Sequence, residues 1–179
     1  MNRLLILACS ETKRDDAGRI PALLRYDGPL WQTLRTVDPE GRAAKVAFLS
    51  AHYGFGDAND PIKSYNARLT PTLARAMIDG GMTTRWPRPP NPNRPDSYGV
   101  QAAYTIARMT NDGAAKFSEV CLVGGHLYLD VMRSFVEGFR REKCLPRSAR
   151  VVEINGPIGL MRQSLRAWIE QRDTVTEAA

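Results

Sequence analysis

Four short apolar runs in this sequence are each followed directly by side chains that can hydrogen-bond, bind anions or move protons. The runs occupy residues 4–9, 46–50, 120–123 and 151–154. The residues at and after their ends are Ser10, Glu11, Thr12, Lys13 and Arg14; Ser50, His52, Tyr53 and Gly54; Gly124, Gly125 and His126; and Asn155, Gly156 and Pro157. In a parallel α/β sheet, ligands bind where the carboxyl ends of the strands meet. The sequence therefore predicts one polar site formed by these groups.

Gly124 and Gly125 stand between the third run and a segment with helical spacing. Two glycines at such a turn present free backbone amides at a helix N-terminus, which is how phosphate or carboxylate is commonly held. The alternative is that they only allow a strand and a helix to pack closely. Neither G-x-G-x-x-G nor G-x-x-x-x-G-K-[ST] occurs, so the sequence supports neither a dinucleotide fold nor a P-loop NTPase.

His52 and His126 are the two histidines of the sequence, and both follow apolar runs. Each is a candidate for acid/base or hydrogen-bonding chemistry, and a structural role is the alternative. Together with Cys9 they form a conceivable metal set, but no ligand spacing supports it, so we expect no metal and no cofactor. Ser10 and Ser50 lie outside any G-x-S-x-G motif, and we therefore assign them hydrogen bonding.

Asp27 lies in the turn Tyr26-Asp27-Gly28-Pro29, which leads into a segment with helical spacing. One hypothesis is that its carboxylate caps that helix. The other is that Asp27 or Asp57 supplies the negative charge that orients water or stabilises a cationic sugar during bond cleavage.

The segment after the second run interleaves aromatic, amide and basic side chains: Tyr53, Phe55, Lys63, Tyr65, Asn66 and Arg68. Such a combination can stack on a nucleobase and hold its phosphate. The alternative is that the aromatic side chains simply anchor a loop.

Segments with helical spacing alternate with the apolar runs. The predicted helices cover residues 29–37, a stretch that starts at Pro71 with Thr70 as its cap, and residues 98–109, 127–139 and 160–169. Strands that alternate with helices imply right-handed crossovers and a parallel sheet covered on both faces. We therefore expect an α/β fold: a small doubly wound, mainly parallel sheet of about four strands with helices on both faces.

The length of 179 residues predicts a single domain over residues 1–172, followed by a flexible tail at 173–179. Residues 85–95 contain five prolines and three arginines, a composition that excludes a helix or a central strand. This segment is expected to be either a surface linker or a basic flap whose exposed Trp86 lies against a bound polyanion.

The charge, hydropathy and cysteine content of the sequence limit the kinds of partner and compartment to be expected. Lys and Arg number 25 against 19 Asp and Glu, a formal net charge of +6 that suits a polyanion, although a merely basic soluble protein is the alternative. No apolar run approaches the roughly 20 residues needed to cross a bilayer, so we expect a cytoplasmic protein without a membrane partner. The three cysteines are widely spaced, which indicates neither a disulfide framework nor a zinc knuckle.

Several motifs between residues 4 and 140 carry a family resemblance. They are Ala8-Cys9-Ser10-x-x-Lys13, Tyr26-Asp27-Gly28-Pro29-Leu30-Trp31, Leu49-Ser50-Ala51-x-Tyr53-Gly54, Tyr65-Asn66-x-Arg68, and Val123-Gly124-Gly125 with Tyr128. The chain resembles a bacterial and phage family labelled YaaA-like or peroxide-stress-like. It is also distantly similar to the uracil-DNA-glycosylase-like core of archaeosine synthase.

This resemblance implies a nucleic-acid or nucleotide context with glycosylase-like chemistry. The residues that it carries over are Ser10, Lys13, Tyr26, Asp27, Ser50, Tyr53, Tyr65 and Gly124. The sequence departs from uracil-DNA glycosylases, because it has no G-Q-D-P-Y and no H-P-S-P string.

The leading hypothesis is an enzyme that cleaves the N-glycosidic bond of a modified base in DNA or in a nucleotide. Asp27 would supply the negative charge, and His52 or His126 would donate to the departing base. The residues expected to bind the base, sugar or phosphate are Ser10, Lys13, Tyr26, Ser50, Tyr53, Tyr65, Asn66, Arg68, Gly124 and Gly125. The alternatives are a non-catalytic nucleic-acid or nucleotide binder of stress response or phage defence, and a hydrolase or transferase acting on small nucleotides.

Overall fold

The computed structural model describes residues 2–91, 93, 98–111 and 114–171, and its centre is a five-stranded sheet in the order β4-β3-β1-β8-β9. The strands are β1 (Arg3–Ala8), β3 (Lys45–Ser50), β4 (Gly54–Asp57), β8 (Glu119–Val123) and β9 (Arg150–Ile154). All neighbours pair in parallel except β4, which is antiparallel to β3. The expected α/β fold with a mainly parallel sheet is confirmed, and the four predicted strands form it with β4 as an added edge strand.

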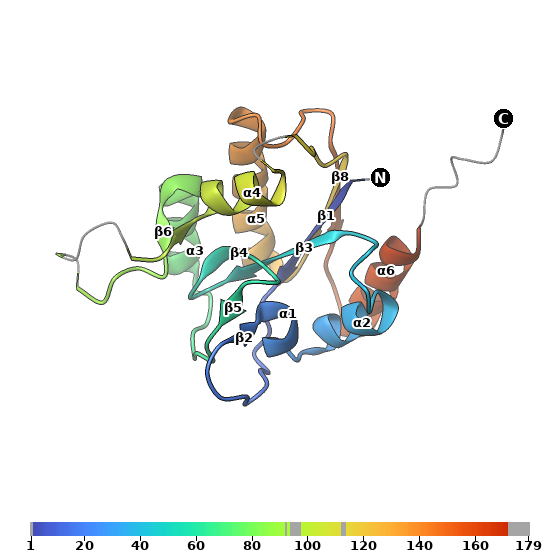
Figure 1. Ribbon diagram of the computed structural model, residues 1–179, viewed down its shortest axis with the longest axis horizontal. Coiled ribbons are helices and arrows are strands. Elements are labelled where there is room, and N and C mark those ends of the chain that lie inside the picture. The colour runs from blue at the N-terminus through green and yellow to red at the C-terminus, as the bar shows by residue number, and fades with distance from the viewer. Residues whose placement is uncertain (1, 92, 94–97, 112–113, 172–179) are drawn as a thin grey trace.

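Helices cover both faces of the sheet, which explains why the strands are almost continuously apolar. Leu4 and Ile6 of β1 belong to the core beneath α3 (Pro71–Gly80), α4 (Ala102–Met109) and α5 (His126–Arg141). Leu5 and Leu7 alternate with them and belong to the core beneath α1 (Ala22–Arg25), α2 (Pro29–Val37) and α6 (Ile158–Glu170). Figure 1 shows the two helix layers with the sheet between them.

The helices begin close to where their sequence signals predict. Pro29 is the first residue of α2, and the Thr70 hydroxyl caps α3 by accepting a hydrogen bond from the Leu73 amide at 3.2 Å. The predicted capping of α2 by Asp27 is wrong, because Gly28 occupies the N-cap position. The helix expected over residues 98–109 begins only at Ala102, because the two preceding residues pair as a strand.

Two short antiparallel ribbons flank the edge strand β4. One joins β2 (Ile20–Pro21) to β5 (Pro61–Ile62), and the other joins β6 (Arg85–Trp86) to β7 (Val100–Gln101). The expectation of an exposed Trp86 is wrong: only 7% of this residue is exposed, because β6 packs its indole into the core beside β4. Positions 92, 94 and 95 of the proline-rich segment and the expected tail at 173–179 lie outside the described residues.

A helix long and apolar enough to cross a bilayer is absent from residues 2–91, 93, 98–111 and 114–171.

Candidate functional site

Several predicted site residues meet where β1 and β3 end, and we call Lys13, Tyr26, Ser50, His52, Tyr53 and Tyr65 the strand-end cluster. Ser50 is the last residue of β3, and its hydroxyl oxygen accepts hydrogen bonds from the amides of His52 and Tyr53, each at 3.0 Å. This local turn reverses the chain toward β4. Ser50 also donates to the Tyr65 hydroxyl at 2.7 Å, and the Tyr65 and Tyr26 hydroxyls are hydrogen-bonded at 2.9 Å.

Aromatic rings surround Tyr65. The His52 ring stacks on the Tyr65 ring with centroids 5.1 Å apart, and Tyr53 meets Tyr65 edge-on at 5.2 Å. Burial lowers the pKa of His52 below its ordinary value of 6.5, so the imidazole is uncharged at neutral pH. The neutral imidazole can donate one hydrogen bond and accept another, but it is a poor proton donor to a departing base unless the pH is acidic.

Lys13 brings an amine to this ring system. An isolated bridge pairs Lys13 with Tyr26, which places the lysine beside the cluster, and its Nζ lies 4.4 Å from the Tyr65 ring centroid. The amine donates to the Glu11 carbonyl at 3.4 Å and forms no ion pair with any described carboxylate. Burial lowers the pKa of Lys13 below its ordinary value, although Cys9 and Glu11 act in the opposite direction.

Cys9 and Tyr128 close the cluster on the side of β8. The Cys9 sulfur lies 3.2 Å from the Tyr128 hydroxyl. Burial raises the pKa of Tyr26, Tyr65 and Tyr128, and Cys9 adds to each increase, so all three phenols stay protonated. Tyr65 and Tyr128 are half-buried and can therefore donate hydrogen bonds to a bound ligand, whereas Tyr26 is fully buried.

The two glycines of the turn after β8, Gly124 and Gly125, have different surroundings. Gly124 is buried, and a Cβ there would stand 2.9 Å from the Ala8 Cβ and 3.1 Å from the Tyr128 Cβ. Gly125 is exposed, is the N-cap of α5, and has no described atom within 4 Å of where its Cβ would be. Close packing therefore accounts for Gly124, whereas the packing alternative leaves Gly125 unexplained.

The three expected catalytic side chains are not brought together by any described contact. The Asp27 carboxylate pairs with Arg35 at 2.5 Å, and His126 is exposed with its Nδ1 3.2 Å from the Asn155 amide nitrogen. Only His52 belongs to the strand-end cluster. Within the described part of the chain, no group of His, Cys, Asp and Glu is placed to hold a metal ion.

The other predicted binding residues lie around the cluster. The Ser10 hydroxyl accepts from the Gly28 amide at 3.1 Å and donates to the Thr12 carbonyl, so it braces the loop that carries Lys13. Asn66 and Arg68 are exposed. Arg68 is nevertheless close enough for its charge to oppose the increase in the pKa of Tyr128.

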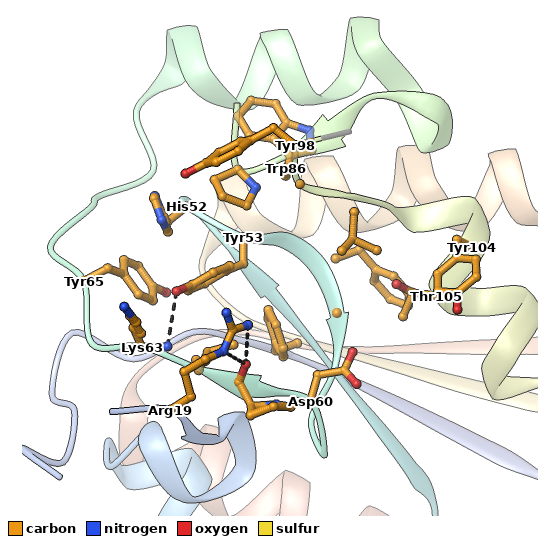
Figure 2. Close-up of a pocket in the computed structure, with 18 of the residues that line it drawn as sticks. Arg19, His52, Tyr53, Asp60, Lys63, Tyr65, Trp86, Tyr98, Tyr104 and Thr105 are labelled. Carbon is orange, nitrogen blue, oxygen red and sulfur yellow. Dashed lines mark hydrogen bonds between the residues drawn. The ribbon is translucent and has the colours of Figure 1, made fainter. Parts of the chain in front are cut away.

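A cleft of about 680 Å³, which we call the β4 cleft, is lined in part by His52, Tyr53 and Tyr65 of the strand-end cluster. Its lining contains the apolar or aromatic residues Phe48, Phe55, Ile62, Trp86, Tyr98 and Tyr104, and the charged residues Arg19, Asp60, Lys63 and Arg108. Figure 2 shows Trp86 and Tyr98 on one side, Tyr104 and Thr105 on another, and Arg19 and Asp60 on a third. The cleft and the strand-end cluster thus share one aromatic wall.

The polar groups of the β4 cleft differ in how far they are already engaged. Arg108 pairs with Asp60 at 2.6 Å and with Asp57 at 3.8 Å, so its charge is largely compensated. Arg19 donates only to the Pro61 carbonyl, and Lys63 has no ion pair with a described residue. The Trp86 indole N–H is buried without a hydrogen-bond partner in the described structure.

The far side of the β4 cleft escaped prediction from the sequence. Tyr104 and Arg108 stand one turn apart on α4, opposite its buried residues Ala102, Ile106 and Met109. The sequence did offer one signal for these two residues, an aromatic side chain and a cation at positions i and i+4 of a helix.

Comparisons of this chain with family models, curated proteins and solved structures found no match. Its function is therefore inferred from the side chains of the site themselves.

Proposed function

We propose that this chain binds a nucleotide unit of a nucleic acid, DNA in the first instance, and cleaves its N-glycosidic bond. The base enters the β4 cleft and the sugar lies at the strand-end cluster. The observation that carries the proposal is the wall formed by His52, Tyr53 and Tyr65: these residues line the aromatic cleft, and Tyr65 also contacts the amine of Lys13 and the hydroxyl group of Ser50.

The dimensions and lining of the β4 cleft support the placement of a base. Its volume of about 680 Å³ lies within the roughly 300–1,000 Å³ typical of small-ligand sites. Aromatic side chains stack on any base, and Tyr53, Tyr98 and Tyr104 offer such surfaces.

Uncompensated cations support the placement of a phosphate. Arg19 and Lys63 line the cleft without a described ion pair, and the whole chain carries a formal charge of +6. A phosphodiester therefore has Arg19 and Lys63 as positive groups in the cleft, and Lys13 lies in the adjoining strand-end cluster. The resemblance to a glycosylase-like core is consistent with this arrangement.

One observation favours a second candidate, which is binding without cleavage. The Asp27 carboxylate is engaged by Arg35, and no other described carboxylate contacts the phenols and imidazole of the cluster. A site of this kind lacks the negative group that the carboxylate mechanism requires. Turnover distinguishes the two candidates.

The first test measures the binding of fluorescent single-stranded DNA by anisotropy. Tyr104 is 62% exposed on α4, so Tyr104→Ala is expected to fold normally and to weaken binding by about 5- to 150-fold, the equivalent of the 1–3 kcal/mol of one base stack. Leu160→Ala is the matched control, because Leu160 is 58% exposed on α6 and does not line the cleft. Equal affinities for the wild type and both variants would remove the proposed base site.

The second test looks for turnover. The chain is incubated with DNA that carries diverse modified bases, and the solution is searched by mass spectrometry for released base. We expect release of at least one base, with a loss of release in the Tyr53→Ala variant. Binding that weakens with salt but releases no base would instead support the non-catalytic candidate.

A further inference from the structure

The side chains of the strand-end cluster favour one of two known ways of breaking an N-glycosidic bond. A negative group or an activated water is one route, and attack by an amine is the other. The expected carboxylate of Asp27 is held by Arg35, whereas the cluster contains the amine of Lys13. We propose that Lys13 Nζ is the nucleophile of this site, and that it attacks C1′ of a nucleotide sugar to form a covalent imine. This inference rests on the proposed function, because it requires a nucleotide at the wall formed by His52, Tyr53 and Tyr65.

The position of Lys13 suits attack on a ligand at that wall. Its bridge to Tyr26 and the loop braced by Ser10 hold the backbone, and the amine lies over the Tyr65 ring. The residue is half-buried, so a ligand can still reach it. Its one described hydrogen bond is to the Glu11 carbonyl at 3.4 Å, a long contact that a substrate can displace.

The surroundings of Lys13 favour the neutral amine that attack requires. The nearby phenols of Tyr26 and Tyr65 stay protonated, because burial raises the pKa of each, so they contribute no negative charge. Burial also lowers the pKa of Lys13, and this effect exceeds the opposing influence of Cys9 and Glu11. Schiff-base lysines are commonly found in such desolvated positions.

The step balances without a further reactant. The Nζ lone pair forms a bond to C1′, and the C1′–N bond to the base breaks, so its electron pair leaves with the base. The base takes up one proton, and the amine loses one. The second amine proton transfers to O4′ as the sugar ring opens, which leaves a C=N bond between Nζ and C1′. Water then adds to the imine, which releases the amine and leaves an abasic aldehyde.

The same imine also forms when the amine reacts with the aldehyde of an abasic site, which is the product of the proposed reaction. This reverse reaction gives a direct experiment. The wild-type chain is mixed with a single-stranded DNA oligonucleotide that carries one aldehydic abasic site, and sodium cyanoborohydride reduces any imine to a stable amine. We expect a covalent adduct, and peptide mapping by mass spectrometry is expected to locate it on Lys13. Lys13→Arg keeps the positive charge but cannot form the adduct, and we expect at least a tenfold loss.

Lys116→Arg is the matched control, because Lys116 is an exposed lysine that belongs neither to the lining of the β4 cleft nor to the strand-end cluster, and we expect this variant to retain the wild-type yield. An adduct that maps to another lysine, or that persists undiminished in Lys13→Arg, would overturn the inference. The mapping uses the wild-type chain, so this result stands even if the variant folds poorly.

A parallel binding measurement separates the inference from the proposed function. The same oligonucleotide is prepared with a tetrahydrofuran in place of the aldehydic sugar, and its binding to the wild type is followed by anisotropy. Binding of this oligonucleotide, together with no adduct on the aldehyde, overturns the role of Lys13 and leaves the proposed function standing. Absence of binding overturns the proposed function and the inference with it.

Discussion

At the scale of single residues, Tyr65 organises the candidate site. Its hydroxyl accepts from Ser50 and is hydrogen-bonded to Tyr26, and its ring contacts His52, Tyr53 and Lys13. Ser50 and Tyr26 are fully buried, so their hydroxyls depend on Tyr65 for this hydrogen bonding. One side chain therefore holds both the polar groups and the aromatic wall in place.

Tyr65→Phe separates these two roles, because it keeps the ring and removes the hydroxyl. We expect the free energy of unfolding to fall by about 1–3 kcal/mol, since buried hydroxyls lose a hydrogen-bond partner. Denaturant unfolding measures the change. Tyr104→Phe is the control: its hydroxyl has no described hydrogen bond, and stability should change little. Equal effects of the two substitutions would contradict the central role of the Tyr65 hydroxyl.

The environment of His52 predicts a dependence of stability on pH. Burial lowers the pKa of His52 below 6.5, so the folded chain binds this proton more weakly than the unfolded chain does. Stability is therefore lost as the pH falls from 6.5 toward the folded pKa, and the loss is constant below that value. His52→Gln should be less sensitive to acid than the wild type when melting temperatures are compared at about pH 8 and about pH 5. A difference between the two proteins that does not change with pH would contradict this expectation.

At the scale of elements, the two adjacent glycines in the turn from β8 into α5 have different structural roles. Gly124 packs against Ala8 and Tyr128, which lets β8 and α5 approach the strand-end cluster closely. Gly125 is exposed at the helix N-terminus. Only the first position is therefore restricted by space.

A pair of alanine substitutions tests this division. Gly124→Ala places a methyl group against Ala8 and Tyr128, and such overpacking typically costs about 1–3 kcal/mol. Gly125→Ala meets no described atom within 4 Å, so only the poorer N-cap that alanine makes should lower the free energy of unfolding, by less than about 1 kcal/mol. Denaturant unfolding of both variants is the measurement. The expectation fails if the two substitutions cost the same.

At the scale of the whole molecule, a buried network joins β1, β8 and α6 at the edge of the sheet where β1 and β8 begin. Arg3 donates to the Trp168 carbonyl at 2.5 Å and pairs with Glu119 at 3.4 Å, and the Trp168 indole N–H donates to Glu119. The guanidinium also lies 3.7 Å from the Trp168 ring centroid. These contacts fasten α6 to the sheet, far along the chain from β1.

Glu119→Ala leaves Arg3 buried without its carboxylate, and the loss of one partner of a buried pair typically costs about 3–5 kcal/mol. Glu137→Ala is the control, because Glu137 is 66% exposed and its pair with Arg140 should contribute less than about 1 kcal/mol. Thermal and denaturant unfolding give both values. A loss no larger for Glu119→Ala than for Glu137→Ala would show that the network does not hold α6.

The sequence by itself determined the main layers of the fold and the meeting of polar residues where β1 and β3 end. Apolar runs predict buried strands because the faces of a parallel sheet are covered, and Thr70 and Pro71 mark a helix start through their own backbone chemistry. Ser50 and Lys13 come together because parallel strands end at the same edge of the sheet. These consequences follow from periodicity and local geometry, which a single sequence contains.

Only the tertiary structure decided the partners of individual side chains. β4 forms although two of its four residues are glycine, because pairing with β3 and packing against Phe48 override its weak strand propensity. Arg35 engages Asp27, and Trp86 is buried rather than exposed. The β4 cleft arises from two ribbons and a helix that are distant in sequence. Such contacts depend on packing in three dimensions, and for this reason the meeting of polar residues at the strand ends was predictable, whereas the pairing of Asp27 with Arg35 and the burial of Trp86 were not.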